Sequence, residues 1–148
     1  MKRIAGMCAL LLCAAALSGC RSEHFAMDAC EWKLQTVLRG DLEAAQDDTL
    51  VVAVGEADAR YPDAARVNIT LTAADGALTV TDAANDTTYH GVYAMQQQTP
   101  DGTEYAVTID GVSGYATVSE TQYAGQPAVL TMPLRIGGYD LYFTANEQ

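Results

Sequence analysis

The sequence predicts an all-β fold, an antiparallel up-and-down meander of about eight strands. The chain after residue 30 is rich in Thr, Val, Tyr and Ile, its apolar residues recur at every second position, and Asp-Gly and Gly-Gly pairs separate the segments. A meander of many short strands has to bury its apolar faces and protect its two edges. Closure into a small barrel does both, and a two-sheet β-sandwich is the alternative.

The first predicted strand spans residues 31–38. Trp32, Leu34 and Thr36 alternate along it, so a regular strand places these three side chains on one face. The opposite face then carries Lys33, Gln35 and Val37.

The next three segments are less regular. Residues 41–48 are compatible with a loop or with one helical turn. Residues 50–54 are apolar enough for a strand that is buried on both faces. Residues 58–65 include Pro62, which interrupts a strand and predicts a loop or a short helix.

The clearest hairpin spans residues 67–80. Asp75-Gly76 provides a tight turn between two alternating segments. The apolar residues that share one face of this hairpin are Val67, Ile69, Leu71, Leu78 and Val80.

The rest of the chain predicts five further strands, separated by turn residues such as Asp110-Gly111 and Gly137-Gly138. In the second of them Tyr105, Val107 and Ile109 face the same way. The five strands are residues 88–96, 104–110, 115–119, 128–134 and 139–145.

Residues 1–19 have the pattern of a bacterial signal peptide. Lys2 and Arg3 form a positive start, and residues 4–17 are uncharged and mainly apolar. As a helix, this stretch would be about 21 Å long, which is shorter than the ~30 Å hydrocarbon core of a bilayer. A cleaved signal is therefore favoured over a spanning helix.

The last three residues of the signal and the residue after them, Leu17-Ser18-Gly19-Cys20, resemble the bacterial lipobox. This resemblance implies that Cys20 is lipid-modified and becomes the first residue of the mature chain; an ordinary cleaved signal is the alternative. Two or three acyl chains together hold a protein stably on a membrane. We therefore expect an extracytoplasmic protein anchored to the cell membrane or outer membrane, with a tether over residues 20–29 and a β-barrel domain over residues 30–148.

The charge of the chain argues against nucleic acid as a partner. After the predicted cleavage the chain keeps six basic and 19 acidic residues, a net charge of −13. Such a charge repels phosphate groups and anionic lipid headgroups. The membrane is thus expected to be a partner through the lipid on Cys20 alone.

The four cysteines do not predict a disulfide framework. Cys8 and Cys13 lie in the signal, and the lipid occupies Cys20, so Cys30 is left without a partner. We expect Cys30 to be a small, half-buried apolar residue at a strand start. If Cys20 were free, a Cys20–Cys30 disulfide would be expected instead.

Several short motifs resemble those of lipocalin-like bacterial lipoproteins. They are Trp32-Lys33-Leu34 at the start of the domain, the central strand Thr88-Tyr89-His90-Gly91-Val92-Tyr93, and the final Tyr139-Asp140-Leu141-Tyr142-Phe143. The resemblance implies a small up-and-down barrel with a binding role. The long region 41–65 and the lack of a Gly just before Trp32 depart from that pattern.

No motif in the sequence predicts catalysis, a metal site or a cofactor. His90 has no second ligand at metal-binding spacing, and the acidic stretch from Asp47 to Asp63 lacks the alternation of a calcium loop. Ser113 is not in a nucleophile elbow. We therefore expect that the protein is not an enzyme.

Eight tyrosines against two phenylalanines and one tryptophan are the most unusual compositional feature. Tyrosine suits places where one end of a ring is apolar and the other is wet, although half-buried strand positions explain it too. The first functional hypothesis is a non-catalytic lipocalin-like module that binds a small or partly apolar ligand within its barrel or at its mouth. The second is an envelope interaction or structural protein that presents an acidic, Tyr-bearing face to a protein or glycan. The candidate ligand residues are Tyr89, Tyr93, Tyr105, Tyr115, Tyr139 and Tyr142.

Overall fold

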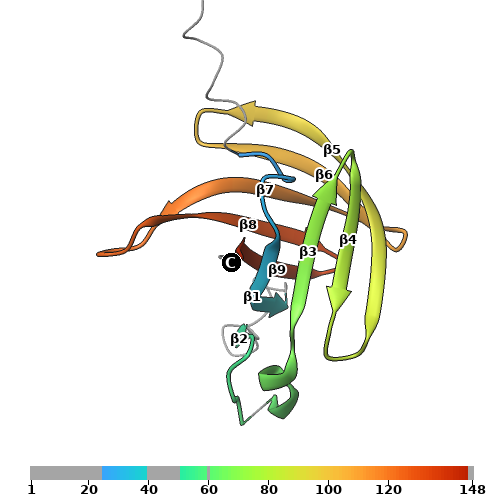
Figure 1. Ribbon diagram of the computed structural model, residues 1–148, viewed down its shortest axis with the longest axis vertical. Coiled ribbons are helices and arrows are strands. Elements are labelled where there is room, and N and C mark those ends of the chain that lie inside the picture. Colours follow the sequence, from blue (N-terminus) through green and yellow to red (C-terminus); the bar gives the residue numbers. More distant parts are fainter. Residues whose placement is uncertain (1–24, 40–50, 60, 147–148) are drawn as a thin grey trace, which may run out of the picture.

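A computed structural model describes residues 25–39, 51–59 and 61–146. The predicted signal peptide, Cys20 and residues 41–48 lie outside the described residues. The described chain forms antiparallel strands and one short 3-10 helix, η1 (Figure 1). The elements are β1 (Trp32–Arg39), β2 (Val51–Ala53), η1 (Pro62–Arg66), β3 (Ile69–Ala74), β4 (Ala77–Asp82), β5 (Thr87–Thr99), β6 (Gly102–Ile109), β7 (Val112–Gln122), β8 (Ala128–Ile136) and β9 (Tyr139–Ala145).

Eight of these strands form a closed barrel. The strand order β1-β3-β4-β5-β6-β7-β8-β9 follows the sequence, and β9 pairs back onto β1 from Trp32–Ala145 to Arg39–Tyr139. β3 pairs with only the first two residues of β1, Trp32 and Lys33. The short β2 pairs with the same edge of β1 at Thr36–Leu38. The predicted up-and-down meander is confirmed, and the small closed barrel is consistent with a lipocalin-like barrel.

Tight turns set the register of the hairpins. Asp75 and Gly76 have φ angles of 50° and 81°, so both central residues of the β3–β4 turn lie in the left-handed region. This conformation matches the twist of the flanking strands and favours Asp-Gly pairs. The same two residue types connect β6 and β7 at Asp110-Gly111, as the sequence predicted.

The interior of the barrel is occupied by apolar side chains. Trp32 is 0% exposed, and Leu71 and Leu78 of the predicted β3–β4 hairpin are each 1% exposed. Met27, from the segment before β1, packs against the same cluster. Together the buried members of this core are Met27, Trp32, Leu34, Leu71, Leu78, Tyr105, Val107, Ala116, Val118, Met132, Leu134 and Phe143.

A β-bulge in β1 corrects the predicted faces of this strand. Leu34 pairs with Phe143, but Thr36 pairs with Tyr142, so Gln35 is the extra residue. After a bulge the alternation of faces shifts by one position. Val37 therefore packs against the core, whereas Thr36 does not share the face of Trp32 and Leu34.

The segment that follows β1 also differs in part from the prediction. β2 is not buried on both faces, because Val52 is buried but Ala53 is exposed. β2 pairs only with Thr36–Leu38 near the end of β1, so only one of its faces packs against the core. Residues 62–66 form the short helix that Pro62 indicated, and none of the helices among the described residues could span a membrane.

Two strand glycines allow neighbouring strands to approach closely. A Cβ atom on Gly91 would lie 2.3 Å from the carbonyl oxygen of Thr108, and one on Gly114 would lie 2.3 Å from that of Arg135. Glycines at such points permit the sharp coiling of strands that barrel closure requires. The close approach of Thr108 thus explains why a glycine stands at position 91 in the central strand.

Candidate ligand groove

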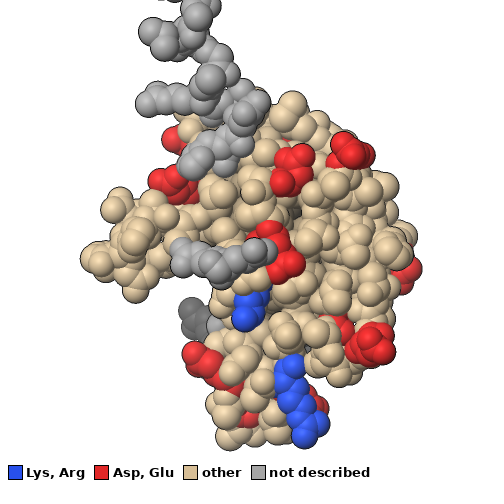
Figure 2. All heavy atoms as spheres, in the orientation of Figure 1, with Lys and Arg blue, Asp and Glu red and all other residues tan. Residues whose placement is uncertain are grey.

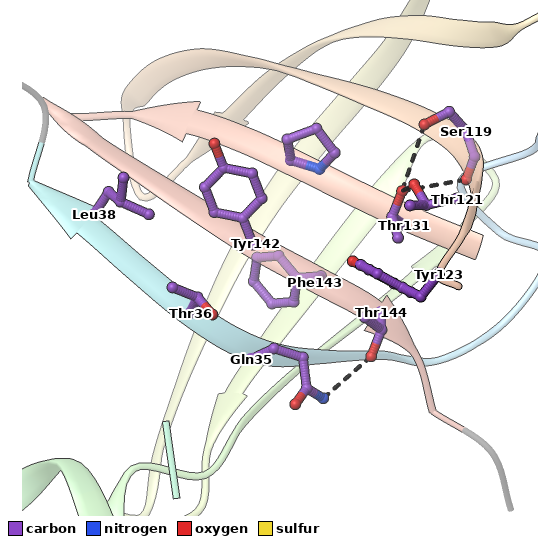
Figure 3. A pocket seen from close by; sticks show the side chains of 11 residues that line it. Gln35, Thr36, Leu38, Ser119, Thr121, Tyr123, Thr131, Tyr142, Phe143 and Thr144 are labelled. Atoms are coloured by element: carbon purple, nitrogen blue, oxygen red, sulfur yellow. Dashed lines mark hydrogen bonds between the residues drawn. The ribbon is translucent and has the colours of Figure 1, made fainter. Parts of the chain in front are cut away.

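A groove of about 470 Å³ lies on the outer face of the barrel across β7, β8, β9 and β1 (Figure 3). Strands far apart in the sequence contribute to it, because barrel closure brings β1 beside β9. Its lining residues are Gln35, Thr36, Leu38, Ser119, Thr121, Tyr123, Thr131, Pro133, Tyr142, Phe143 and Thr144.

The alternation of strand residues explains why the groove is polar. On β9, Phe143 is buried in the core, so its neighbours Tyr142 and Thr144 point outward. On β8, Met132 is buried, so Thr131 and Pro133 point outward. Apart from Phe143, which belongs to the core, the groove is therefore lined by positions outside the core.

Register then places these outward side chains in rows. Thr36 lies opposite Tyr142, and Tyr142 lies opposite Pro133, which forms one row across three strands. The next row joins Thr144, Thr131 and Ser119. The bulge at Gln35 completes the first row, because it turns Thr36 to the outer face.

Pro133 sits on an interior strand of the sheet, where proline is rare because it has no N–H for the ladder. β7 and β8 pair as far as Ala116–Leu134, and their pairing begins again at Ser119–Thr131. The ladder is thus interrupted beside Pro133. This interruption lies directly at the groove.

The hydroxyl groups of the groove contact one another. The Oγ1 atoms of Thr121 and Thr131 are 2.9 Å apart, and Thr131 Oγ1 also lies 3.5 Å from Ser119 Oγ. On the other side of the groove, Gln35 Nε2 donates to Thr144 Oγ1 at 3.1 Å. A hydroxyl has one donor and two acceptor positions, so these groups keep capacity for a ligand.

In the part of the chain that the structure describes, no charged side chain lines the groove, although the protein is strongly acidic. The hairpin formed by the ends of β7 and β8 is uncharged from Thr121 to Met132 and projects from the body of the molecule (Figure 1). In Figure 2 this projection has no red or blue atoms, whereas acidic groups are spread over the rest of the visible face. The uncharged hairpin brings Tyr123 to the groove.

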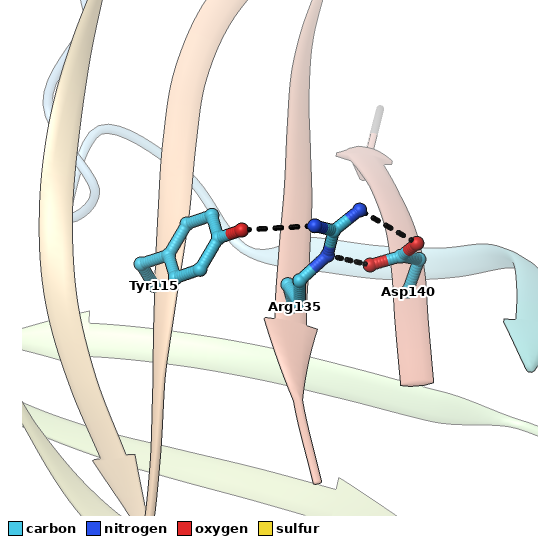
Figure 4. Close-up of polar contacts among 3 residues, drawn as sticks. All are labelled: Tyr115, Arg135 and Asp140. Atoms are coloured by element: carbon cyan, nitrogen blue, oxygen red, sulfur yellow. Dashed lines mark hydrogen bonds and ion pairs between the residues drawn. The ribbon is translucent and has the colours of Figure 1, made fainter. Parts of the chain in front are cut away.

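A charged cluster lies beside the groove on the same strands (Figure 4). Arg135 Nε donates to Asp140 Oδ1 at 2.6 Å, and Arg135 Nη1 donates to the Tyr115 hydroxyl at 3.1 Å. The guanidinium also lies 5.8 Å from the centre of the Tyr115 ring. Tyr115 is therefore occupied in a contact across β7, β8 and β9.

The six candidate tyrosines do not gather at one site. Tyr142 alone lines the groove, and Tyr115 contacts Arg135 nearby. Tyr105 is in the core and Tyr93 packs edge-on against it, with ring centres 5.7 Å apart. Tyr89 and Tyr139 are exposed at positions outside the groove lining.

Tyr123 lines the groove but was not among the predicted residues. It lies between two predicted strands, in a stretch without periodicity, where sequence reasoning expects a turn. β7 in fact extends to Gln122 and carries Tyr123 out on a long hairpin. The feature that marks Tyr123 as a candidate is its exposed fraction of 53%, which is known only from the structure.

The remaining candidates for chemistry lie apart from one another. His90 and Ser113 are exposed on the outer surface of β5 and β7. Among the described residues, no three His, Cys, Asp or Glu side chains gather as metal ligands would. Cys30 is half-buried just before β1, as predicted, and burial raises the pKa of its thiol.

No family model, curated protein or solved structure matches the chain. The fold and the groove therefore carry the functional argument by themselves.

Proposed function

We propose that this protein is a lipid-anchored extracytoplasmic binding protein without catalytic activity, and that it takes a small ligand in the outer groove. The observation that carries the proposal is the contrast between two sites. The barrel interior is occupied by large side chains such as Trp32 and Phe143, whereas the outer groove has about 470 Å³ of space. This volume is within the range of small-molecule sites.

The lining supports binding rather than catalysis. Its polar groups are hydroxyls and one amide, and none of the lining residues is an acid, a base or a cysteine. Groups of this kind orient a ligand through hydrogen bonds but supply no nucleophile with an adjacent base. An acidic, Tyr-bearing face is less well supported at the groove, because its lining contains no acidic residue.

The lipid anchor on Cys20 belongs to the same proposal. The chain from Cys20 to Phe25 is short, so the anchor would hold the barrel close to a membrane. A Cys20→Ser variant should lose incorporation of a labelled fatty acid and gain no diacylglycerol mass. Fatty-acid labelling that persists in this variant would contradict the anchor.

The binding proposal is tested with the purified full-length protein and a library of small-molecule fragments, followed by NMR of labelled tyrosine and tryptophan rings. Fragment binding should perturb the rings of Tyr142 and Tyr123 and should be lost in a Tyr142→Ala variant. Tyr89→Ala is a matched control, because Tyr89 and Tyr142 are 41% and 42% exposed and only Tyr142 lines the groove. Fragments that perturb Trp32 of the interior instead would overturn the outer site.

A further inference from the structure

We infer that the groove binds an uncharged saccharide. This inference rests on the proposed function and names the ligand class of the same site. It is carried by three properties of the lining: the absence of charge, the density of hydroxyl groups, and two exposed tyrosine rings.

The first property excludes ionic ligands. A charged ligand that gives up part of its water needs a counter-charge or several directed hydrogen bonds. Among the described residues, the groove lining has no cationic group for a sulfate, phosphate or carboxylate, and the neighbouring guanidinium of Arg135 is already held by Asp140. The net charge of the protein also repels anions at longer range. The described lining equally has no carboxylate for a cation.

The second property excludes a purely apolar ligand. Seven of the eleven lining residues carry a hydroxyl group, and Gln35 adds an amide. An acyl chain placed over these groups would remove their water without replacing the hydrogen bonds, and polar groups left unpaired in this way weaken binding. A ligand rich in hydroxyl groups satisfies the same positions.

The third property, the two tyrosine rings, provides apolar surface for the C–H faces of a sugar ring. The rings of Tyr142 and Tyr123 are about half exposed and stand at the groove (Figure 3). Each ring offers a flat apolar surface with a polar tip. A sugar ring has the same division, with C–H groups on its faces and hydroxyl groups around its rim.

An extended peptide fits the site less well. Peptides commonly bind to a sheet by adding a strand to an unpaired edge. The groove instead lies over the face of β8 and β9, and both strands are paired on each side, β8 with β7 and β9, and β9 with β8 and β1. No free backbone edge is available beneath the groove to recognise a peptide.

The test uses the full-length protein in a detergent without a sugar headgroup, because a glycosidic detergent would compete for the groove. Neutral glucan, mannan, galactan and chitin oligosaccharides are titrated alongside sulfated and uronic-acid saccharides, fatty acids and a peptide library. At least one neutral oligosaccharide should bind, and the charged saccharides should bind at least tenfold more weakly.

Three variants locate the binding. Tyr123→Ala and Thr131→Val should each reduce saccharide affinity at least tenfold, whereas Tyr89→Ala should change it less than twofold. Tyr123 lies on an exposed hairpin, so its truncation leaves the barrel intact and keeps the test valid even if another variant unfolds. Saccharide binding that none of the groove variants weakens would overturn the inference.

The two proposals fail differently. If fatty acids or peptides perturb the groove tyrosines and neutral saccharides do not, the saccharide inference is wrong and the groove remains a binding site. If no ligand class perturbs the groove, both proposals are wrong.

Discussion

Arg135 and Asp140 form a two-pronged contact between neighbouring strands. Nε donates to Oδ1 at 2.6 Å, and Nη2 donates to Oδ2 at 3.1 Å. Asp140 is buried beneath the guanidinium, whereas the side chain of Arg135 is 57% exposed. The hydrogen bonds that Arg135 donates to Asp140 hold the pKa of Arg135 above its ordinary value, so its guanidinium stays charged over the whole physiological range.

Removing the charge of Asp140 should destabilise the barrel. An Asp140→Asn variant keeps the shape of the side chain but loses one charge-assisted acceptor in a buried place. Its Tm is expected to fall by a few degrees, on the order of 5 °C, in thermal unfolding followed by circular dichroism. Asp101→Asn, at an exposed turn, is the control and should leave Tm within about 1 °C. Equal Tm values for both variants would show that the contact is without consequence.

Adding a methyl group to Gly91 should disturb barrel closure. The new Cβ would lie 2.3 Å from the backbone oxygen of Thr108, which cannot move without shifting β6. Gly91→Ala should therefore lower the free energy of unfolding by about 1–3 kcal/mol in urea titrations. Ala94→Val on the same strand points to an exposed position and should be tolerated. An unchanged urea midpoint for Gly91→Ala would contradict the close approach of β5 and β6 at this position.

The hydroxyl of Tyr105 fastens the segment before β1 to the barrel. It accepts from the Met27 N–H at 3.2 Å and donates to the Phe25 carbonyl at 3.3 Å. Tyr105→Phe should cost about 1 kcal/mol of unfolding free energy. It should also accelerate amide hydrogen exchange at Met27, and exchange at the wild-type rate would argue against this fastening.

The same hydroxyl predicts a pH effect. Burial raises the pKa of Tyr105 above its ordinary value, so the unfolded chain ionises first as the pH rises. The stabilisation is fully present below the unfolded pKa of about 10 and is lost as the pH rises through the folded pKa. Thermal unfolding between pH 8 and 11.5 should show a steeper alkaline loss of Tm in the wild type than in Tyr105→Phe. Parallel profiles would contradict the raised pKa.

Thiol counting tests the state of both late cysteines. Burial raises the pKa of Cys30, so the folded protein should react slowly with a maleimide at pH 8. In denaturant, after reduction of any Cys20–Cys30 disulfide, the mature protein should expose one thiol if Cys20 carries its lipid, and two if it does not. Mass spectrometry after labelling gives this count, and a second labelled thiol would overturn the lipid assignment.

Local patterns predicted much of the fold because turns and alternation are local properties. The strand over residues 139–145 has the bounds that the sequence indicated, and the Asp75-Gly76 hairpin has the expected apolar face. Strands β5 and β7 proved longer than predicted. Their ends carry polar residues that extend beyond the core, so periodicity gave no sign of them.

The groove was beyond sequence reasoning for a different reason. Its residues come from both ends of the chain, and only the register between β1 and β9 brings Thr36 to Tyr142. That register includes a bulge at Gln35, and no turn residue or glycine at this position predicts a bulge. The tyrosine excess brought in Tyr142, which lines the groove, together with Tyr105, which alternation places in the core, and composition does not separate the two.

The pairing of the first strand with the last also has a consequence for biosynthesis. The ladder that closes the barrel needs residues up to Ala145 of β9, the final strand of the barrel. Until β9 has been synthesised, the open edges of β1 and β8 have no partner, and Phe143 is missing from the core. Contacts of such long sequence separation form late and slowly. If the chain is exported as we propose, this delay keeps it unfolded and able to pass through a translocation channel before the barrel can lock.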